Sequence, residues 1–90
     1  MRESPRLYFF MPFVYILRCA DGSLYTGAAI DVAARLLRHR AGKASRYTRS
    51  RLPVTLVWRR KVRSWSAALR EERRIKMLSR GGKLEMISRR

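Results

Sequence analysis

Residues 13–26 read FVYILRCADGSLYT, and this stretch decides the fold of the chain. Its first half, residues 13–19, is rich in β-branched and aromatic residues and predicts a strand. Residues 24–26 predict a short second strand, and the intervening residues 20–23, ADGS, are a turn signal. We therefore expect an antiparallel hairpin at the start of the domain.

The length of the hairpin loop decides on which side of the sheet two tyrosines lie. A three-residue loop that ends in a left-handed Gly22 places Leu17 opposite Tyr25. Tyr15 and Tyr25 then point to the same face as diagonal neighbours, roughly 7–8 Å apart. A two-residue loop of Asp21 and Gly22 would put them on opposite faces of the sheet. The two tyrosines can therefore belong to one site only if the longer loop forms.

The rest of the chain alternates between helical and extended patterns. The expected segments are a helix over 32–41 between Asp31 and Gly42, a basic loop over 43–53, a strand over 54–58 that can extend to Val62, a helix from Ser64 or Ser66 to about Leu78, a break at Arg80-Gly81-Gly82, and a short helical turn over 83–87. The core stripe expected on the first helix consists of Ile30, Ala33, Ala34, Leu37 and Ala41. The order β-β-α-β-α-(α) predicts an α/β (α+β) domain whose small, three-stranded, mostly antiparallel sheet is flanked by helices.

The composition describes one small, folded and strongly basic domain. The chain has 90 residues, and its 22 Lys and Arg against 6 Asp and Glu give a net charge of +16. The hydrophobic fraction of 47% is ordinary for a globular domain and excludes a disordered basic tail. A body with this charge favours a polyanionic partner, either nucleic acid or an anionic membrane surface.

The cysteine count and the hydropathy exclude further classes of protein. Cys19 is the only cysteine, which excludes internal disulfides and cysteine-based zinc clusters. No apolar run reaches the length of a membrane span or of a signal-peptide core, so we expect a cytoplasmic protein that does not enter a membrane. Residues 1–11 show no clear period and are expected to be an extension of a single domain over 12–90. Deletion of residues 1–10 is expected to leave the fold intact.

The second predicted helix places a carboxylate among apolar residues. At about 100° per residue, Glu72 lies within the apolar stripe and Glu71 lies at its margin. A carboxylate on a buried face is costly unless it is paired or bound to a metal. Two interpretations stay open: an ion pair with Lys76 or with an arginine of the first helix, and a Mg²⁺ ion held by carboxylate oxygen. The apolar residues on this helical face are Trp65, Ala68, Leu69 and Ile75.

Basic residues gather on the first helix and in the loop that follows it. Arg35 and His39 are one turn apart and share a helical face, where an arginine can hold a phosphate while a histidine moves a proton. The loop over 43–51 mixes cations with hydroxyl groups, which suits contacts with DNA phosphates, although a merely solvated loop would look the same. The candidate nucleic-acid contacts are Lys43, Arg46, Tyr47, Arg49 and Arg51.

Taken together, these motifs resemble the GIY-YIG nuclease superfamily. Residues 14–16, VYI, and residues 25–27, YTG, look like the two halves of its motif, with Val14 in place of the usual glycine. The resemblance covers 13–87 and is greatest to small stand-alone proteins related to the nuclease domain of the excision-repair subunit UvrC. The further matching positions are Arg35, His39 and Glu72.

The resemblance implies a catalytic role for each of five residues. Tyr15 would be the general base or its partner in activating water, and Tyr25 would orient water or phosphate. Arg35 would contact the scissile phosphate, and His39 would accept a proton from Tyr15. Glu72 would be the sole acidic ligand of a Mg²⁺ or Mn²⁺ ion.

The activity that the resemblance implies is a Mg²⁺-dependent endonuclease that hydrolyses DNA phosphodiester bonds. Its sequence specificity would be low, and it would act on DNA structure or in repair. Two other interpretations stay open: a nucleic-acid-binding module without chemistry, and a nuclease subunit that depends on a protein partner for its target. The residues also leave open whether RNA is a substrate and how many copies assemble.

Overall fold

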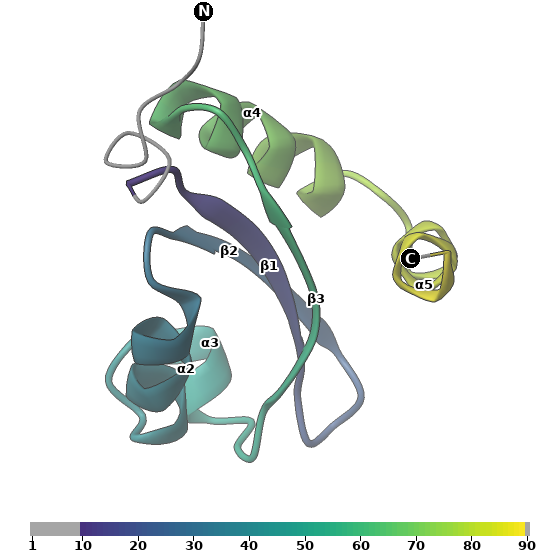
Figure 1. Ribbon diagram of the computed structural model, residues 1–90. Helices are drawn as coiled ribbons and strands as arrows, with labels where there is room; N and C mark the ends of the chain where they lie inside the picture. The colour runs from purple at the N-terminus through teal and green to yellow at the C-terminus, as the bar shows by residue number, and fades with distance from the viewer. Residues whose placement is uncertain (1–9, 90) are drawn as a thin grey trace, which may run out of the picture.

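The computed structural model of the chain describes residues 10–89 and shows a three-stranded sheet flanked by helices (Figure 1). This arrangement confirms the predicted α+β fold class. The expectations about residues 1–9 lie outside the described residues. The elements follow in the order β1 (Phe13–Arg18), β2 (Leu24–Ala29), α2 (Val32–Arg40), α3 (Arg46–Arg49), β3 (Thr55–Lys61), α4 (Trp65–Lys76) and α5 (Arg80–Ser88).

The hairpin forms with the longer of the two loops. β1 pairs antiparallel with β2 so that Leu17 lies opposite Tyr25. Gly22 has a φ of 84°, in the left-handed region that glycine adopts without steric cost. Tyr15 and Tyr25 therefore lie on the same face, as the three-residue loop predicts.

β2 is longer than the sequence indicates. The predicted strand ends at residue 26, whereas pairing with β1 continues to Ala29. Gly27 and Ala28 are weak strand formers, so propensity alone gives no reason to extend the strand through them. The pairing of Val14 with Ala28 and of Tyr15 with Gly27 holds these residues in the sheet.

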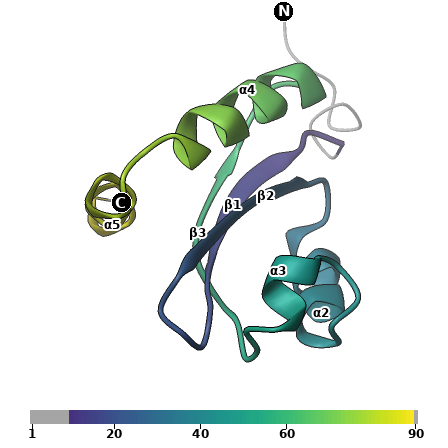
Figure 2. The ribbon, with the colours of Figure 1, turned by 180° about the vertical axis from the view of Figure 1, so that it is seen from behind.

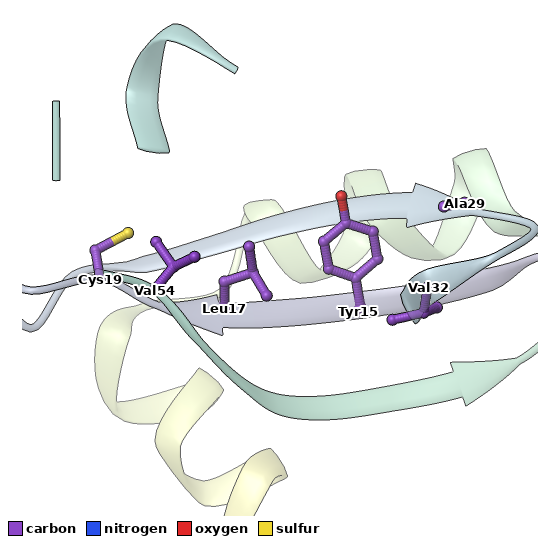
Figure 3. Packing of buried hydrophobic residues seen from close by; sticks show 6 residues of the cluster. All are labelled: Tyr15, Leu17, Cys19, Ala29, Val32 and Val54. Atoms are coloured by element: carbon purple, nitrogen blue, oxygen red, sulfur yellow. The ribbon is translucent and has the colours of Figure 1, made fainter. Parts of the chain in front are cut away.

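β1 is the central strand of a sheet with the order β2-β1-β3, and both of its faces are buried. One face points toward α2 and α3 (Figures 1 and 2). Here Tyr15 and Leu17 pack with Val32 and Val54 in one core cluster, shown in Figure 3. Burial on both faces explains why this strand reads as a nearly continuous apolar run rather than as an alternation.

The opposite face of the sheet is covered by α4. Val14 and Ile16 of β1 pack against Ala68 and Ile75 of α4 and against Trp58 of β3. α4 lies along this face, and α5 follows it at the far end from the N-terminus of α4 (Figures 1 and 2). The helix that carries Glu72 is thus separated by the sheet from the helix that carries His39.

α2 turns a different face to the core than its apolar pattern predicts. Val32 and His39 are buried and Leu36 is half-buried, whereas Leu37 is 67% exposed. The predicted stripe through Ile30, Ala33, Ala34, Leu37 and Ala41 is therefore wrong. The apolar pattern treats histidine as a polar residue that faces solvent. The ring of His39 can be buried because Tyr15 and Thr48 form hydrogen bonds with both of its nitrogens, and the helix is rotated accordingly.

Two further segments depart from the sequence expectations. The predicted basic loop contains the single-turn helix α3, which Ser45 caps by accepting a hydrogen bond from the amide of Thr48. The predicted break at Arg80-Gly81-Gly82 lies instead inside α5, whose N-cap is Ser79. A serine cap and the packing of Met86 and Ile87 on the core outweigh the low helix propensity of the two glycines.

Candidate active site

The hydroxyl of Tyr15 belongs to a buried hydrogen-bonded chain that joins β1 to α2 and α3. Tyr15 Oη lies 2.8 Å from His39 Nε2, and His39 Nδ1 lies 2.8 Å from Thr48 Oγ1. The three residues are only 2%, 1% and 0% exposed, in the same order. The hydroxyl of Thr48 also donates to the carbonyl oxygen of Ser45 at 3.4 Å. The chain of contacts therefore connects the central strand with the cap of a surface helix.

The hydrogen bond from Thr48 to Ser45 indicates which nitrogen of His39 carries the proton. A threonine hydroxyl has one proton, so Thr48 can accept from His39 Nδ1–H while it donates to Ser45. In that arrangement Nε2 of His39 carries a lone pair and accepts the hydroxyl proton of Tyr15. His39 is then placed to take a proton from the phenol.

The protonation equilibria of the two rings agree with this direction. Burial lowers the pKa of His39 below its usual range, and the positive charge of Arg35 lowers it further. The imidazole is therefore neutral at pH 7 and able to accept a proton. Burial also raises the pKa of Tyr15 to about 12, so this phenol keeps its proton at pH 7 in the protein alone.

Charges from three elements act on the phenol of Tyr15. Tyr25 on β2 and Glu72 on α4 raise the pKa of Tyr15 in addition to its burial, and the positive charge of Arg35 on α2 lowers it. α2 and α4 lie on opposite faces of the sheet (Figure 2). The five predicted catalytic residues are linked through this one phenol, since His39 binds its hydroxyl and the charges of the other three act on it. The five are Tyr15, Tyr25, Arg35, His39 and Glu72.

Gly27 on β2 makes room for the phenol. A Cβ atom at this position would lie 2.6 Å from Cζ and 2.6 Å from Oη of Tyr15. Figure 3 shows the ring of Tyr15 rising from β1 across the neighbouring strand. Glycine is required here for close approach and not for an unusual backbone angle, because only hydrogen fits between the strand and the ring.

The ring of Tyr25 also packs against the ring of His39. Its ring meets the ring of His39 edge to face, with 5.3 Å between centroids, and stacks on Tyr47 of α3 at 6.0 Å. The guanidinium of Arg51 lies 3.8 Å from the centroid of the Tyr47 ring. Tyr25 is thus held in an aromatic stack that links the hairpin to α3.

Glu72 and Glu71 lie on two flanks of the line through which α4 contacts the sheet. Their side chains are similarly shielded, at 19% and 16% exposed, so burial does not separate them as the helical stripe predicts. The two carboxylates differ instead in their partners. Glu71 binds Arg60 at 2.9 Å and also binds Arg74, whereas Glu72 has a single ion pair among residues 10–89, with Lys76 at 2.9 Å.

The residues around Glu72 fit a hard cation that keeps most of its water. Glu72 lines an open groove of about 320 Å³ together with Lys76 and Met77. No group of three or more His, Cys, Asp or Glu that could hold a metal occurs within residues 10–89. A single carboxylate beside open space suits Mg²⁺, which commonly takes one or two carboxylates plus waters and substrate phosphates. Lys76 would have to release Glu72 for such an ion to bind.

The basic segment around α3 divides into structural and available cations. Arg51 is tied to Asp21 at 3.1 Å and to the carbonyl oxygen of Tyr47 at 3.0 Å, so it braces α3 against the hairpin turn. Arg46 and Arg49 are exposed and have no ion pair or side-chain hydrogen bond with residues 10–89. Arg51, which the sequence predicts to contact DNA, thus also stabilises the position of α3.

The family is identified by comparison of the whole chain. The pattern of the GIY-YIG catalytic domain matches residues 11–85, and the chain belongs to this family. This membership supports a nuclease-type function. No helix within the described part of the chain is long and apolar enough to cross a membrane.

Within that class, the chain is similar to proteins named UPF0213. It is 49% identical over 78 residues to one from Streptococcus sanguinis, covering 87% of this chain and 90% of that protein. It is 51% identical over 75 residues to one from Staphylococcus epidermidis, covering 83% and 92%. The solution NMR structure of a UPF0213 protein from Bacillus halodurans shares 44% identity and a TM-score of 0.56, covering 86% of this chain and 82% of that one.

Thr48 is the site residue that sequence reasoning missed. It lies within the predicted basic loop over 43–51, where nothing in the local pattern marks its side chain as buried. One signal was present: Ser45 followed three residues later by Thr48 is compatible with a capped helical turn, which would turn Thr48 inward.

Proposed function

We propose that this chain is an endonuclease that hydrolyses phosphodiester bonds of DNA and uses Mg²⁺ or Mn²⁺. The observation that carries the proposal is the buried hydrogen-bonded chain from Tyr15 through His39 to Thr48, whose phenol is acted on by the charges of Arg35 and Glu72. Hydrolysis needs a proton acceptor, a cation for the phosphate and a carboxylate for a metal. These residues supply one of each.

The proton path follows from the directions in which the pKa values of Tyr15 and His39 are shifted. A phenol whose pKa is about 12 is not a preformed base at pH 7. Tyr15 therefore takes a proton from the attacking water while it passes its own proton to Nε2 of His39. The positive charge of Arg35 opposes protonation of His39, so the imidazolium is short-lived and returns its proton after cleavage.

Arg35 and Glu72 have complementary tasks at the phosphate. Arg35 stabilises the charge that develops on the equatorial oxygens, because a guanidinium binds them with two parallel hydrogen bonds. Glu72 would hold the metal ion, which when bound neutralises phosphate charge and stabilises the leaving 3′-oxygen. Low sequence specificity follows if the contacts are mainly with phosphates, which position DNA without reading its bases.

A plasmid-nicking assay tests the proposed activity. Supercoiled plasmid is incubated with the protein in Mg²⁺, in Mn²⁺, and in EDTA, and relaxed and linear products are measured over time. We expect nicking with either ion and none in EDTA. Binding without nicking under all conditions would instead indicate a nucleic-acid-binding module or a subunit that requires a partner.

Thr48 is expected to control the proton path without touching the substrate. Thr48→Val removes the acceptor for Nδ1–H of His39, so the ring no longer favours the tautomer that accepts from Tyr15. Nicking should fall by about 100-fold, the scale of general-base catalysis. Thr48→Ser should restore most of the rate because it keeps the hydroxyl.

Direct measurement of the tautomer separates this effect from unfolding. His39 is the only histidine, so ¹⁵N-histidine labelling gives the ring signals of a single residue. In the wild type we expect a protonated Nδ1 and an unprotonated Nε2. The opposite assignment, or an unchanged tautomer in a Thr48→Val variant that has lost activity, would contradict the role given to Thr48.

The exposed arginines of α3 are expected to bind DNA phosphates. The double variant Arg46→Gln, Arg49→Gln should reduce the slope of log binding constant against log salt by roughly two units, about 0.9 for each phosphate that is no longer neutralised. Arg89→Gln, at the C-cap of α5, serves as the control, since Arg89 pairs with Glu85 and α5 lies away from α3 (Figure 1). An unchanged slope in the double variant would indicate that this segment is merely solvated.

A further inference from the structure

A second groove is lined by Arg35, the arginine whose charge acts on the phenol of Tyr15. It has a volume of about 340 Å³ and lies between the first half of α2 and the beginning of α4. Ile30, from the connection between β2 and α2, and Trp65, the first residue of α4, line it together with Arg35 and Arg38. The groove therefore combines two large apolar side chains with two guanidinium groups and one carboxylate, that of Asp31, which caps α2 by accepting from the amide of Ala34 at 3.0 Å.

The tryptophan in this groove is unusually accessible. Trp65 and Ile30 are each 47% exposed, whereas Trp58, the other tryptophan, is 4% exposed and belongs to the core. Within residues 10–89, the Trp65 ring has no aromatic or cation–π partner. Arg38 is held by a hydrogen bond to the carbonyl oxygen of Lys43 at 3.0 Å, which orients it at the groove wall.

The position of Trp65 relates it to the candidate active site. Trp65, Leu69 and Glu72 follow one another at helical spacing and so lie on one face of α4. Seven residues separate Trp65 from Glu72, a rise of about 10 Å along the helix. A DNA strand with a phosphate near Glu72 would therefore reach Trp65 within a few nucleotides.

The chemistry of the groove selects its occupant. A ligand that fits must offer a flat apolar face to Trp65 and negative charge to the two arginines, and a nucleotide has both. A second copy of this chain is disfavoured, because each copy has a net charge of +16 and would bring further cations to the groove. In a duplex the faces of the bases are covered by their neighbours, so only an unpaired base can stack on a side chain.

We propose that this groove binds an unpaired nucleobase of the DNA strand that is cut, with the base stacked on Trp65 and its neighbouring phosphates on Arg35 and Arg38. The inference rests on the proposed nuclease function and extends it by naming a substrate preference. DNA with unpaired nucleotides at the cleavage position is then preferred over uninterrupted duplex.

Tryptophan fluorescence in EDTA tests the proposal without cleavage. The protein is titrated with a dT oligonucleotide and, separately, with a fully paired duplex of the same length. Stacking on Trp65 should quench emission with the dT oligonucleotide and leave it nearly unchanged with the duplex. Trp65→Phe should bind both DNAs as the wild type does but lose the quenching, because only the buried Trp58 then emits.

Trp65→Ala separates stacking from general electrostatic attraction. Its affinity for the dT oligonucleotide should fall about tenfold or more, the scale of one base–aromatic stack, with little change for duplex. In the nicking assay, the same variant should lose the preference for plasmid or duplex that carries an unpaired loop.

Each outcome bears on one of the two proposals. Equal weakening of both DNAs by Trp65→Ala, or saturable binding of dT without quenching, would overturn the stacking site and leave the nuclease proposal intact. Failure of the wild type to bind either DNA would overturn the proposed function itself. Two results together would assign the groove to a second copy and overturn the stacking site. Tryptophan emission of the wild type would change with protein concentration alone, and Trp65→Ala would no longer form a dimer that the wild type forms.

Discussion

Glu72→Ala is expected to lower metal-dependent DNA cleavage by about a thousandfold or more, the loss anticipated when the carboxylate that holds a catalytic metal is removed. The reason is its position: Glu72 lines an open groove, acts electrostatically on the phenol of Tyr15, and within the described part of the chain is paired with Lys76 alone. DNA binding in EDTA should stay within about threefold, because phosphate attraction depends on the many cations of the surface. Nicking rates and binding isotherms measure the two effects separately.

The neighbouring carboxylate provides the matched control. Glu71 is equally shielded but is occupied by Arg60 and Arg74, and these contacts lower its pKa, with the hydrogen bond from Arg74 as the largest cause. Glu71→Ala should therefore reduce stability by up to about 1 kcal/mol and leave the nicking rate nearly unchanged. Equal loss of cleavage in the two variants, with both still folded by thermal unfolding, would contradict the assignment of Glu72.

Gly27→Ala is expected to reduce cleavage by about 100-fold while the chain remains folded. The added methyl group would lie 2.6 Å from the hydroxyl oxygen of Tyr15, and one of the two must move. Tyr15 has little freedom to do so, since its ring is 2% exposed and its hydroxyl is bound to His39. A displacement of about 1 Å at a reacting group is enough for a loss of this size.

A second glycine shows that the effect belongs to the site. Gly81 lies in the first turn of α5, where a Cβ atom would meet only Ser79 Oγ, at 3.9 Å. Gly81→Ala should leave cleavage unchanged and raise stability by roughly 0.5–1 kcal/mol, because alanine loses less backbone entropy in a helix. If Gly27→Ala cleaves at the wild-type rate, the close approach of Tyr15 to β2 has no catalytic importance.

Much of the fold follows from short-range patterns in the sequence. The turn signal before Leu24 predicts the hairpin, and of the two loops that the sequence allowed, the one with Gly22 in the left-handed region forms and sets Tyr15 and Tyr25 on one face. Ser64 and Asp31 cap the helices that they were expected to begin. These features are readable because turn geometry and helix caps depend on residues within a few positions of one another.

The rotation of α2 shows where this type of reasoning stops. Apolar periodicity favours burial of Leu37, yet the helix buries His39 instead and leaves Leu37 67% exposed. Periodicity treats every histidine as polar, and it cannot register that Tyr15 and Thr48 will satisfy both ring nitrogens. The pairing of Glu71 with Arg60 was hidden for a related reason, since Arg60 belongs to a different element, whereas the ion pair of Glu72 with Lys76 is one of the two interpretations that the sequence left open.

What the sequence by itself determined is the hairpin, the α+β class, the basic character and the candidate residues of the family motif. Each depends on local spacing or on composition, which one chain displays without a partner. What only the tertiary structure decided is the order of contacts in the site. Tyr15 and His39 are 24 residues apart, and His39 and Thr48 are 9 apart. Their hydrogen bonds exist because packing of α2 and α3 on one face of the sheet brings these side chains together, and that packing is a property of the folded chain as a whole.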